Sequence, residues 1–405
     1  MIRKIPVHRL VPGMYVADLH RGWLEHTLWR SRFLVRDEAM VNRLIEEGIT
    51  EVSIDTERGV DIPRPPSAEP RLVVAAPTIV SRIERLKAKP QTLSLGEERR
   101  RAGLLLREAN ATLKELMTDA RLGRIVDIGK LEPFAERMIE SVMRNPDALA
   151  PLARLKLQGS YATEHALATT SLVVALARQQ GLELAEIERL AMGTLVKDVG
   201  HAALDARLVA KPGQLSMDER AVMESHVEEG LAVLEATSRL AETSVAVILE
   251  HHERFDGSGY PFHMSGSDIS NAGRMVAIVD TYDAMTSDRP YRRAVSPTIA
   301  LCQIFDEGGH QFDAEVVAGF IRAIGVYPVG TLVRLESGHL AVVEELHPES
   351  LLSPQVRVIF HAGRRSYVTP VVVDLSATYG NHYGQIVGSE NFEDWGLSPV
   401  RWQPA

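Results

Sequence analysis

The amino-acid sequence predicts a mainly α protein, in which a helical bundle follows a small N-terminal α+β module and precedes a β-rich C-terminal extension. Three observations lead to this fold class. In the long central part, apolar residues recur at three- and four-residue spacing, the period of an amphipathic helix. Before it and after it, short β-rich runs are separated by turns rich in Gly, Pro and Ser. At 405 residues the chain is too long for one ordinary core, so two or three domains are expected.

Residues 1–62 are predicted to form the N-terminal module. Residues 11–16 have the pattern of a turn that leads into a strand, and residues 51–55 that of a second strand. Between them, residues 37–45 have helical spacing. The apolar face of this helix is expected to consist of Met40, Leu44 and Ile45.

The rest of the chain divides into three predicted segments. Residues 63–95 are a linker, because the stretch from residue 61 to residue 70 is polar and dense in proline. Residues 96–325 are nearly all helical, and they contain a capping box at Ser216 and Glu219. Residues 326–405 form the β-rich extension. Its strand-like runs are residues 330–335, 340–343 and 356–360.

Composition excludes several classes of protein. The formal net charge of -9 argues against a protein that coats polymeric nucleic acid, although a local cluster of arginines could still hold a small anion. The single cysteine, Cys302, excludes a disulfide framework and suits a reducing compartment. No apolar run is long enough for a membrane span, and the N-terminus lacks the apolar stretch of a secretory signal. We therefore expect a cytoplasmic protein of bacterial type.

Polar residues interrupt the apolar pattern of five predicted helices. A buried carboxylate without a partner costs several kcal/mol, so a set of them calls for cations. Imidazole and carboxylate ligands together suit Fe, Mn, Zn or Ni. The sequence therefore predicts a metal cluster on the core-facing sides of these helices. Its candidate ligands are His165, Asp198, His226, His251, His252 and Asp280.

Each of these residues alone has a simpler explanation. A single histidine on an apolar face is more often a hydrogen-bonded core residue than a metal ligand. Asp280 could pair with Arg274 or Arg289, and Asp198 could cap the turn that follows it. The complete set favours the metal cluster over this coincidence.

The run from residue 251 to residue 261, His-His-Glu-Arg-Phe-Asp-Gly-Ser-Gly-Tyr-Pro, places a glycine-rich turn directly after two candidate ligands. With this run, residues from about 100 to 325 resemble an HD-GYP domain, the subgroup of HD-superfamily phosphohydrolases that hydrolyses cyclic di-GMP. The N-terminal module resembles an uncharacterised domain often found ahead of HD-GYP domains. The other matching segments are residues 161–165, 211–213, 219–226, 277–280 and 282–292.

The resemblance implies a role for each matching residue. Asp198 would bridge two metal ions, and the water held between the ions would attack a phosphodiester. The other implied ligands are His165, His226, His251, His252 and Asp280. The loop Gly259, Tyr260 and Pro261 would shape the substrate pocket. Arg289 and Arg292 would contact the phosphates of the dinucleotide, although both also fit a solvated helix end.

The resemblance also sets expectations for cofactors and partners. Some relatives hold a third metal through a glutamate four residues before the first histidine, where this chain has Tyr161. We expect one or two divalent ions, with Fe or Mn favoured over Zn or Ni. The expected partners are cyclic di-GMP, a possible signalling protein and a possible second copy of the chain.

One pentapeptide departs from the family, which has His-Asp-x-Gly-Lys where this chain has Lys197-Asp198-Val199-Gly200-His201. Lysine binds a metal only when neutral, and lowering its pKa from about 10.4 to near 7 costs roughly 4 to 5 kcal/mol. The first metal position, which the family builds from its His-Asp histidine with His165, Asp198 and Asp280, is therefore weakened. The second keeps all its side chains: Asp198, His226, His251 and His252.

Three hypotheses follow from this departure. The chain could be an inactive module that binds cyclic di-GMP or a protein partner, with Lys197 pairing with Asp280 or with a ligand phosphate. It could be a phosphodiesterase that is slow or that depends on an unusual metal arrangement. Or histidine and lysine could have exchanged places, because residues four apart share a helix face. In that case His201 reaches the metal, Lys197 takes the phosphate role, and Asp198 and His201 are the catalytic residues.

Overall fold

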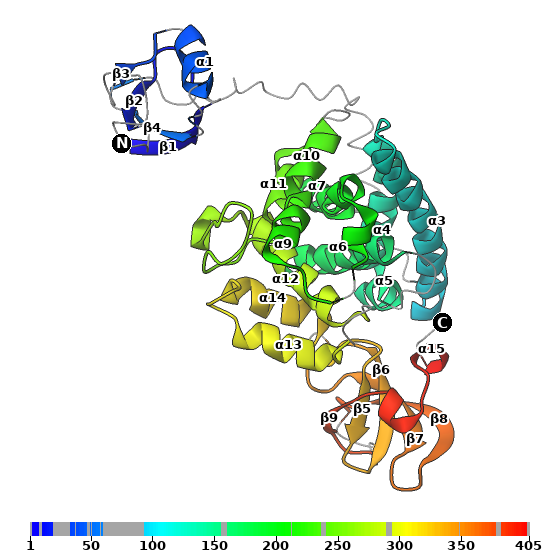
Figure 1. Cartoon of the computed structure of the whole chain (residues 1–405). Coiled ribbons are helices and arrows are strands. Elements are labelled where there is room, and N and C mark those ends of the chain that lie inside the picture. The colour runs from blue at the N-terminus through cyan, green and yellow to red at the C-terminus, as the bar shows by residue number, and fades with distance from the viewer. Residues whose placement is uncertain are drawn as a thin grey trace. The chain divides into compact units, whose positions relative to one another are not determined.

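The structure is a computed structural model of the chain, shown in Figure 1. It separates into two compact units, Met1–Arg85 and Leu86–Ala405. Among the described residues, no helix combines the length and the apolar content needed to cross a bilayer. The predicted linker lies outside the described residues except at its C-terminal end. The described residues are 2–7, 10–18, 33–36, 38–46, 49, 51–56, 58–59, 93–154, 160–211, 213–235, 240–288, 294–347, 349–377 and 382–402.

The first unit is a four-stranded sheet with one helix. Its strands, in the order β1-β4-β2-β3, are β1 (Ile2–Pro6), β4 (Glu51–Asp55), β2 (Tyr15–Asp18) and β3 (Phe33–Leu34), and the described pairs are antiparallel. The helix α1 (Glu38–Glu46) and the strand at residues 51–55 confirm the prediction. The predicted apolar face was partly wrong. Leu44 is buried, but Ile45 is 45% exposed because the buried face is centred on Val41 and Leu44.

The second unit begins as a bundle of helices. Its central helix, α6, is buried along almost its whole length and packs against α7, α12 and α14. The capping box predicted at the start of α9 is confirmed: Ser216 Oγ accepts from Glu219 N, and the Glu219 carboxylate accepts from Ser216 N at 2.8 Å. The helices are α3 (Leu95–Arg121), α4 (Glu132–Arg144), α5 (Pro146–Ala153), α6 (Tyr161–Gln179), α7 (Leu184–Val196), α8 (Ala206–Val209), α9 (Met217–Glu224), α10 (His226–Glu235), α11 (Glu242–Glu250), α12 (Asn271–Met285), α13 (Pro297–Asp306) and α14 (Ala314–Ile324), with short 3₁₀ turns η2 (Ile128–Leu131), η3 (Val199–Ala203) and η4 (Gly266–Asp268).

The same unit ends in an antiparallel five-stranded sheet of order β8-β7-β6-β5-β9. The three predicted strand runs fall within β5 (Leu332–Leu335), β6 (His339–Glu345) and β7 (Gln355–His361). The sequence did not predict β8 (Ser366–Asp374) or β9 (Ile386–Glu390). Most side chains of β8 are exposed, so this edge strand lacks the alternation that identifies a half-buried strand. The chain closes with η5 (Glu393–Trp395) and α15 (Pro399–Trp402).

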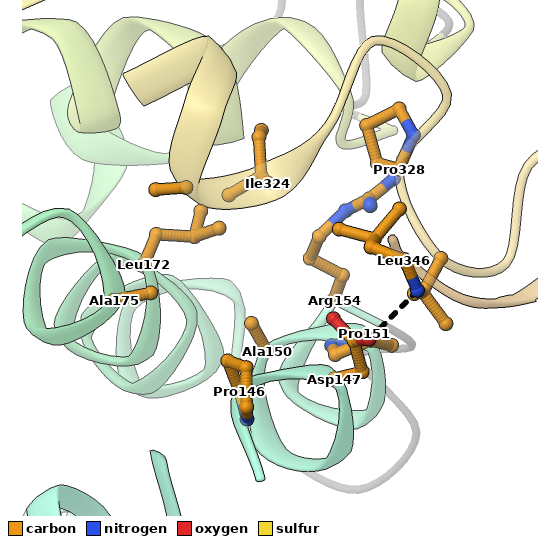
Figure 2. Close-up of a pocket in the computed structure, with 12 residues that line it drawn as sticks. Pro146, Asp147, Ala150, Pro151, Arg154, Leu172, Ala175, Ile324, Pro328 and Leu346 are labelled. Atoms are coloured by element: carbon orange, nitrogen blue, oxygen red, sulfur yellow. Dashed lines mark hydrogen bonds between the residues drawn. The ribbon is translucent and has the colours of Figure 1, made fainter. Parts of the chain in front are cut away.

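Buried polar groups fasten the C-terminal sheet to the helices. Arg99 of α3 is 4% exposed and donates from Nη2 to the Glu344 carbonyl at 2.8 Å. Asp147 of α5 accepts from the Leu346 amide at 2.8 Å, a bond drawn in Figure 2 at one side of a pocket. Burial raises the pKa of Asp147 to about 6. Arg154 also lines this pocket, which therefore belongs to the seam between the helices and the sheet.

Candidate functional site

The six predicted ligands come together in two groups that share Asp198. In each group, one ligand atom from every residue lies within 4.8 Å of the others. Three of the six lie just past helix ends and not within helices as predicted, because α7 stops at Val196 and α11 stops at Glu250. The first group is His165, Asp198 and Asp280. The second group is Asp198, His226, His251 and His252.

A close backbone contact brings Asp198 to the second group. Asp198 directly precedes η3, and His226 is the first residue of α10. A Cβ on Gly200 would lie 1.9 Å from the His226 carbonyl oxygen and 2.5 Å from the Gly230 nitrogen. Only glycine at position 200 therefore lets η3 approach α10 this closely.

The second group fits a divalent metal ion. His226 Nδ1 donates to the Met223 carbonyl at 2.7 Å, and His251 Nδ1 donates to the Ile248 carbonyl at 2.8 Å. In the neutral rings, both Nε2 atoms then carry lone pairs, and they face each other at 3.4 Å. Burial is the main cause that lowers the pKa of His226 to about 3, so this imidazole is neutral at neutral pH.

The same lone pairs also face a carboxylate. Asp198 Oδ1 lies 3.8 Å from His226 Nε2 and 3.6 Å from His251 Nε2. A backbone carbonyl that fixes the far nitrogen of each ring is the usual support of a metal-binding histidine. The donor set of carboxylate and neutral imidazoles is the set that a divalent transition metal prefers.

The first group already contains a cation. Lys197, the residue that caps the end of α7, is fully buried, and its Nζ contacts the Asp198 carboxylate and lies 2.6 Å from Asp280 Oδ1. Nζ also lies 3.2 Å from His165 Nε2. Burial opposes the charge on Lys197, but the two carboxylates outweigh it and raise its pKa. The first group therefore does not fit a metal ion while the Lys197 ammonium lies among its ligand atoms.

The orientation of the His165 ring is fixed by Asp283, a residue for which no role was predicted from the sequence. His165 Nδ1 donates to Asp283 Oδ2 at 2.6 Å, and Asp283 is fully buried. This contact fixes the ring so that Nε2 faces Lys197 and Asp280. Asp283 follows Asp280 by three positions on α12, so helical spacing alone could have identified it.

The exchange hypothesis requires one helix that carries Lys197 and His201. The structure breaks the helix between them, since α7 ends at Val196 and the 3₁₀ turn η3 begins at Val199. The His201 ring stacks on His226 at a centroid distance of 3.9 Å, and its Nδ1 donates to the Asp198 carbonyl at 3.2 Å. His201 thus lies beside the second group, while Lys197 lies in the first. The catalytic roles of Asp198 and His201 remain predictions.

Pairing of Asp280 with Arg274 and capping of the following turn by Asp198, two of the simpler explanations of the carboxylates, were wrong. Arg274 pairs with Asp313 at 2.6 Å and not with Asp280, whose described cationic neighbour is Lys197. Asp198 makes no capping hydrogen bond with its side chain to the turn η3. Arg289 and Arg292, the predicted phosphate contacts, lie outside the described residues.

The predicted Gly-Tyr-Pro loop covers the second group. The Tyr260 ring stacks on His252 at a centroid distance of 4.6 Å, and the Tyr260–Pro261 peptide is cis. A Cβ on Gly259 would lie 2.3 Å from the Arg254 nitrogen, so the loop folds tightly against the segment that follows His252.

Glu253 is a second residue whose role the sequence did not reveal. It is 1% exposed, and its carboxylate accepts from the Phe262 amide at 2.7 Å and from the Met264 amide at 3.0 Å. The two donors follow Pro261 in the chain, so Glu253 fixes the position of the segment that leaves the loop. The position of Glu253 directly after two candidate ligands is the sequence feature that could have indicated this role.

Glu253→Gln is expected to lower the free energy of unfolding by about 1–2 kcal/mol, because one charge-assisted bond to the backbone is replaced by an ill-placed amide. Chemical denaturation would measure this change. Glu250→Gln is a suitable comparison, because Glu250 accepts from the Ser270 amide and lies outside the loop. Unchanged protease resistance of the loop in Glu253→Gln would contradict the role given to Glu253.

Comparisons with known proteins identify the family of the chain. A family model described as a domain of unknown function (DUF3391) matches residues 2–131, and an HD-domain model matches residues 147–316. The chain is 37% identical over 396 residues to "Cyclic di-GMP phosphodiesterase PA4108" of Pseudomonas aeruginosa, covering 98% of this chain and 94% of that protein.

Two further relatives match a part of the chain. "Cyclic di-GMP phosphodiesterase response regulator RpfG" of Xanthomonas campestris is 34% identical over 187 residues, which are 46% of this chain and 50% of that protein. "3'3'-cGAMP-specific phosphodiesterase 2" of Vibrio cholerae is 33% identical over 143 residues, which are 35% of this chain and 27% of that protein. The match along nearly the whole of PA4108, together with the HD-domain match and the Gly-Tyr-Pro sequence, shows that the chain belongs to the HD-GYP family of HD-domain proteins.

Proposed function

We propose that this chain is a signalling protein that binds cyclic di-GMP next to a single divalent metal ion in the second group, and that it hydrolyses this ligand slowly. The observation that carries the proposal is the position of Lys197 Nζ among the ligand atoms of the first group, 2.6 Å from Asp280 Oδ1. The ligand is inferred from PA4108, the relative that matches along nearly its whole length.

The second group supplies the metal site of the proposal. His226, His251 and His252 would bind the ion together with Asp198, whose carboxylate faces two of the rings. The bound ion would acidify a water molecule and polarise a phosphate oxygen. Fe or Mn is favoured over Zn or Ni by the family resemblance.

Lys197 supplies part of the positive charge that a second metal ion would bring. Its ammonium balances the charges of Asp198 and Asp280 and holds the Asp198 carboxylate in place between the two groups. It brings one positive charge where a divalent ion brings two, and it has no coordination position for a water or a phosphate oxygen. Binding of the dinucleotide is therefore retained in the proposal, while the attack on phosphorus loses the stabilisation that a pair of ions gives.

A phosphodiesterase with ordinary turnover is the second candidate function. The match to a protein named as a cyclic di-GMP phosphodiesterase over 98% of this chain favours it. Turnover rate separates the two candidates, because both include binding of the dinucleotide.

Elemental analysis of the purified protein is expected to give about one Fe or Mn per chain, since only the second group has an open set of lone pairs. His251→Ala should lose this metal, because it removes one of three imidazoles, whereas the exposed His310→Ala should retain it. Titration calorimetry would test binding of cyclic di-GMP to the metal-loaded protein. Two metal ions per chain together with rapid turnover would contradict the proposal.

A further inference from the structure

Arg254 lies at the junction between the Gly-Tyr-Pro loop and the helix that carries Asp280. Its Nη1 donates to the Glu253 carbonyl at 3.1 Å, and its Nη2 donates to Thr281 Oγ1 at 3.3 Å. The guanidinium carbon lies 5.3 Å from the centroid of the buried Phe312 ring. These contacts fix the plane of a half-buried guanidinium.

Arg254 is charged but has no carboxylate partner among the residues that the structure describes. Among the described residues, no carboxylate oxygen lies within 4.0 Å of its guanidinium. The two nearest acidic residues in sequence are engaged elsewhere. Glu253 accepts from the backbone of the loop, and Asp256 accepts from Ser258 N at 2.9 Å and lies 3.3 Å from His310.

Arg254 shares this lack of a carboxylate partner with Arg99, whose hydrogen bonds to other described residues go to backbone carbonyls, and differs from two other partly buried arginines of the helical part. Arg144 pairs with Glu98 at 2.7 Å, and Arg274 pairs with Asp313 at 2.6 Å. A guanidinium has five N–H donors, and within the described part of the chain Arg254 gives two hydrogen bonds, both to neutral oxygens. Arg254 therefore keeps N–H donors that could bind an anion.

Arg254 lies two residues after His252 of the second group, and it contacts the residue that follows Asp280 of the first group. Tyr260, whose ring stacks on His252, also donates from its backbone to the His252 carbonyl at 3.3 Å. Thr281, the acceptor of Arg254 Nη2, directly follows Asp280 on α12. Burial lowers the pKa of Arg254, and the charge of Asp280 partly offsets this effect, as expected of a near neighbour.

We infer that Arg254 binds a phosphate group of the cyclic dinucleotide beside the second group, an inference that rests on the proposed function. The planar guanidinium offers two parallel N–H groups to two phosphate oxygens, the geometry that makes arginine a strong phosphate ligand. Stacking on Phe312 and the bond to Thr281 orient the side chain before the ligand arrives, which reduces the entropy lost on binding.

The competing role for Arg254 is a purely structural one, in which it pins the loop to α12. Binding of cyclic di-GMP to the metal-loaded full chain separates the two roles, measured by calorimetry for the wild type, Arg254→Gln, Arg254→Lys and Arg137→Gln. Arg137 is the matched control, an arginine 44% exposed that pairs with Glu108 on the helices α4 and α3. Metal content and melting temperature are measured for every variant.

Arg254→Gln is expected to raise the Kd about ten- to a hundredfold, as loss of a charge-assisted bond implies, with metal content and melting temperature close to the wild type. Arg254→Lys should bind with intermediate affinity, because lysine keeps the positive charge but lacks the two parallel N–H groups of the guanidinium. Arg137→Gln should bind like the wild type.

A Kd of Arg254→Gln within about twofold of the wild type, or weaker binding that is accompanied by loss of metal, would overturn the inference. If Arg254→Gln fails to fold, Arg254→Lys decides: weaker binding supports the phosphate contact, and unchanged binding overturns it. A wild type that holds its metal but shows no binding of cyclic di-GMP overturns the proposed function and this inference with it. Failure of the inference alone appears as a binding wild type with an equally tight Arg254→Gln.

Discussion

Lys197→His is expected to raise the metal content from about one to about two ions per chain, and to raise the rate of cyclic di-GMP hydrolysis at least tenfold. The substitution removes the ammonium that lies 2.6 Å from Asp280 Oδ1 and supplies a neutral imidazole in its place. The first group then has His165, Asp198, Asp280 and the new histidine as ligands. A tenfold rise corresponds to about 1.4 kcal/mol of the activation barrier, well within the several kcal/mol that a metal ion contributes.

Elemental analysis and chromatography of the reaction products would measure both effects on one preparation. Lys114→His is the matched control, because Lys114 is exposed on α3 and the same change of residue there should alter neither value. A variant that still holds one ion and hydrolyses no faster would show that something other than Lys197 limits the first group.

Lys197→Met is expected to lower the free energy of unfolding by about 3–5 kcal/mol in the presence of a chelator. Methionine approximates the length of the lysine side chain but leaves the buried Asp198 and Asp280 carboxylates without the ammonium. Removal of one partner from a buried ion pair is costly because the remaining charge stays desolvated.

The loss in Lys197→Met should be partly reversed by Mn(II), because the empty first group can then bind an ion that binds the folded state only. Denaturation with and without Mn(II) would measure this recovery, and Lys114→Met serves as the exposed control. A loss of less than about 1 kcal/mol in the free energy of unfolding would contradict the proposal that Lys197 replaces a metal ion. A stability that responds to Mn(II) no more than that of the wild type would also contradict it.

The ligand set could be predicted from the sequence because burial constrains polar residues. Histidines and aspartates that interrupt apolar helical patterns have to lie in the core and find partners there, and the structure brings all six together in two groups. The Gly-Tyr-Pro loop and the capping box at Ser216 follow from local chemistry that needs few residues. These features depend on short-range patterns, which one sequence contains in full.

The pairing of Lys197 with Asp280 could only be listed among alternatives, since it joins residues 83 positions apart. The position of the helix end at Val196 was harder to predict, because neither of the next two residues, Lys197 and Asp198, is a glycine or proline that would stop a helix. The close backbone approach of Gly200 to α10 and the hydrogen bond between Asp283 and His165 likewise depend on how distant elements pack. Strand β8 was missed because its side chains are mostly exposed.

Anomalous diffraction from crystals of the wild-type protein grown with Mn(II) tests the central claim most directly. The account predicts one anomalous peak per chain, among Asp198, His226, His251 and His252, with Lys197 Nζ between the carboxylates of Asp198 and Asp280. A second peak about 3.5–4 Å from the first, bound by His165 and Asp280 with Lys197 turned away, would contradict it.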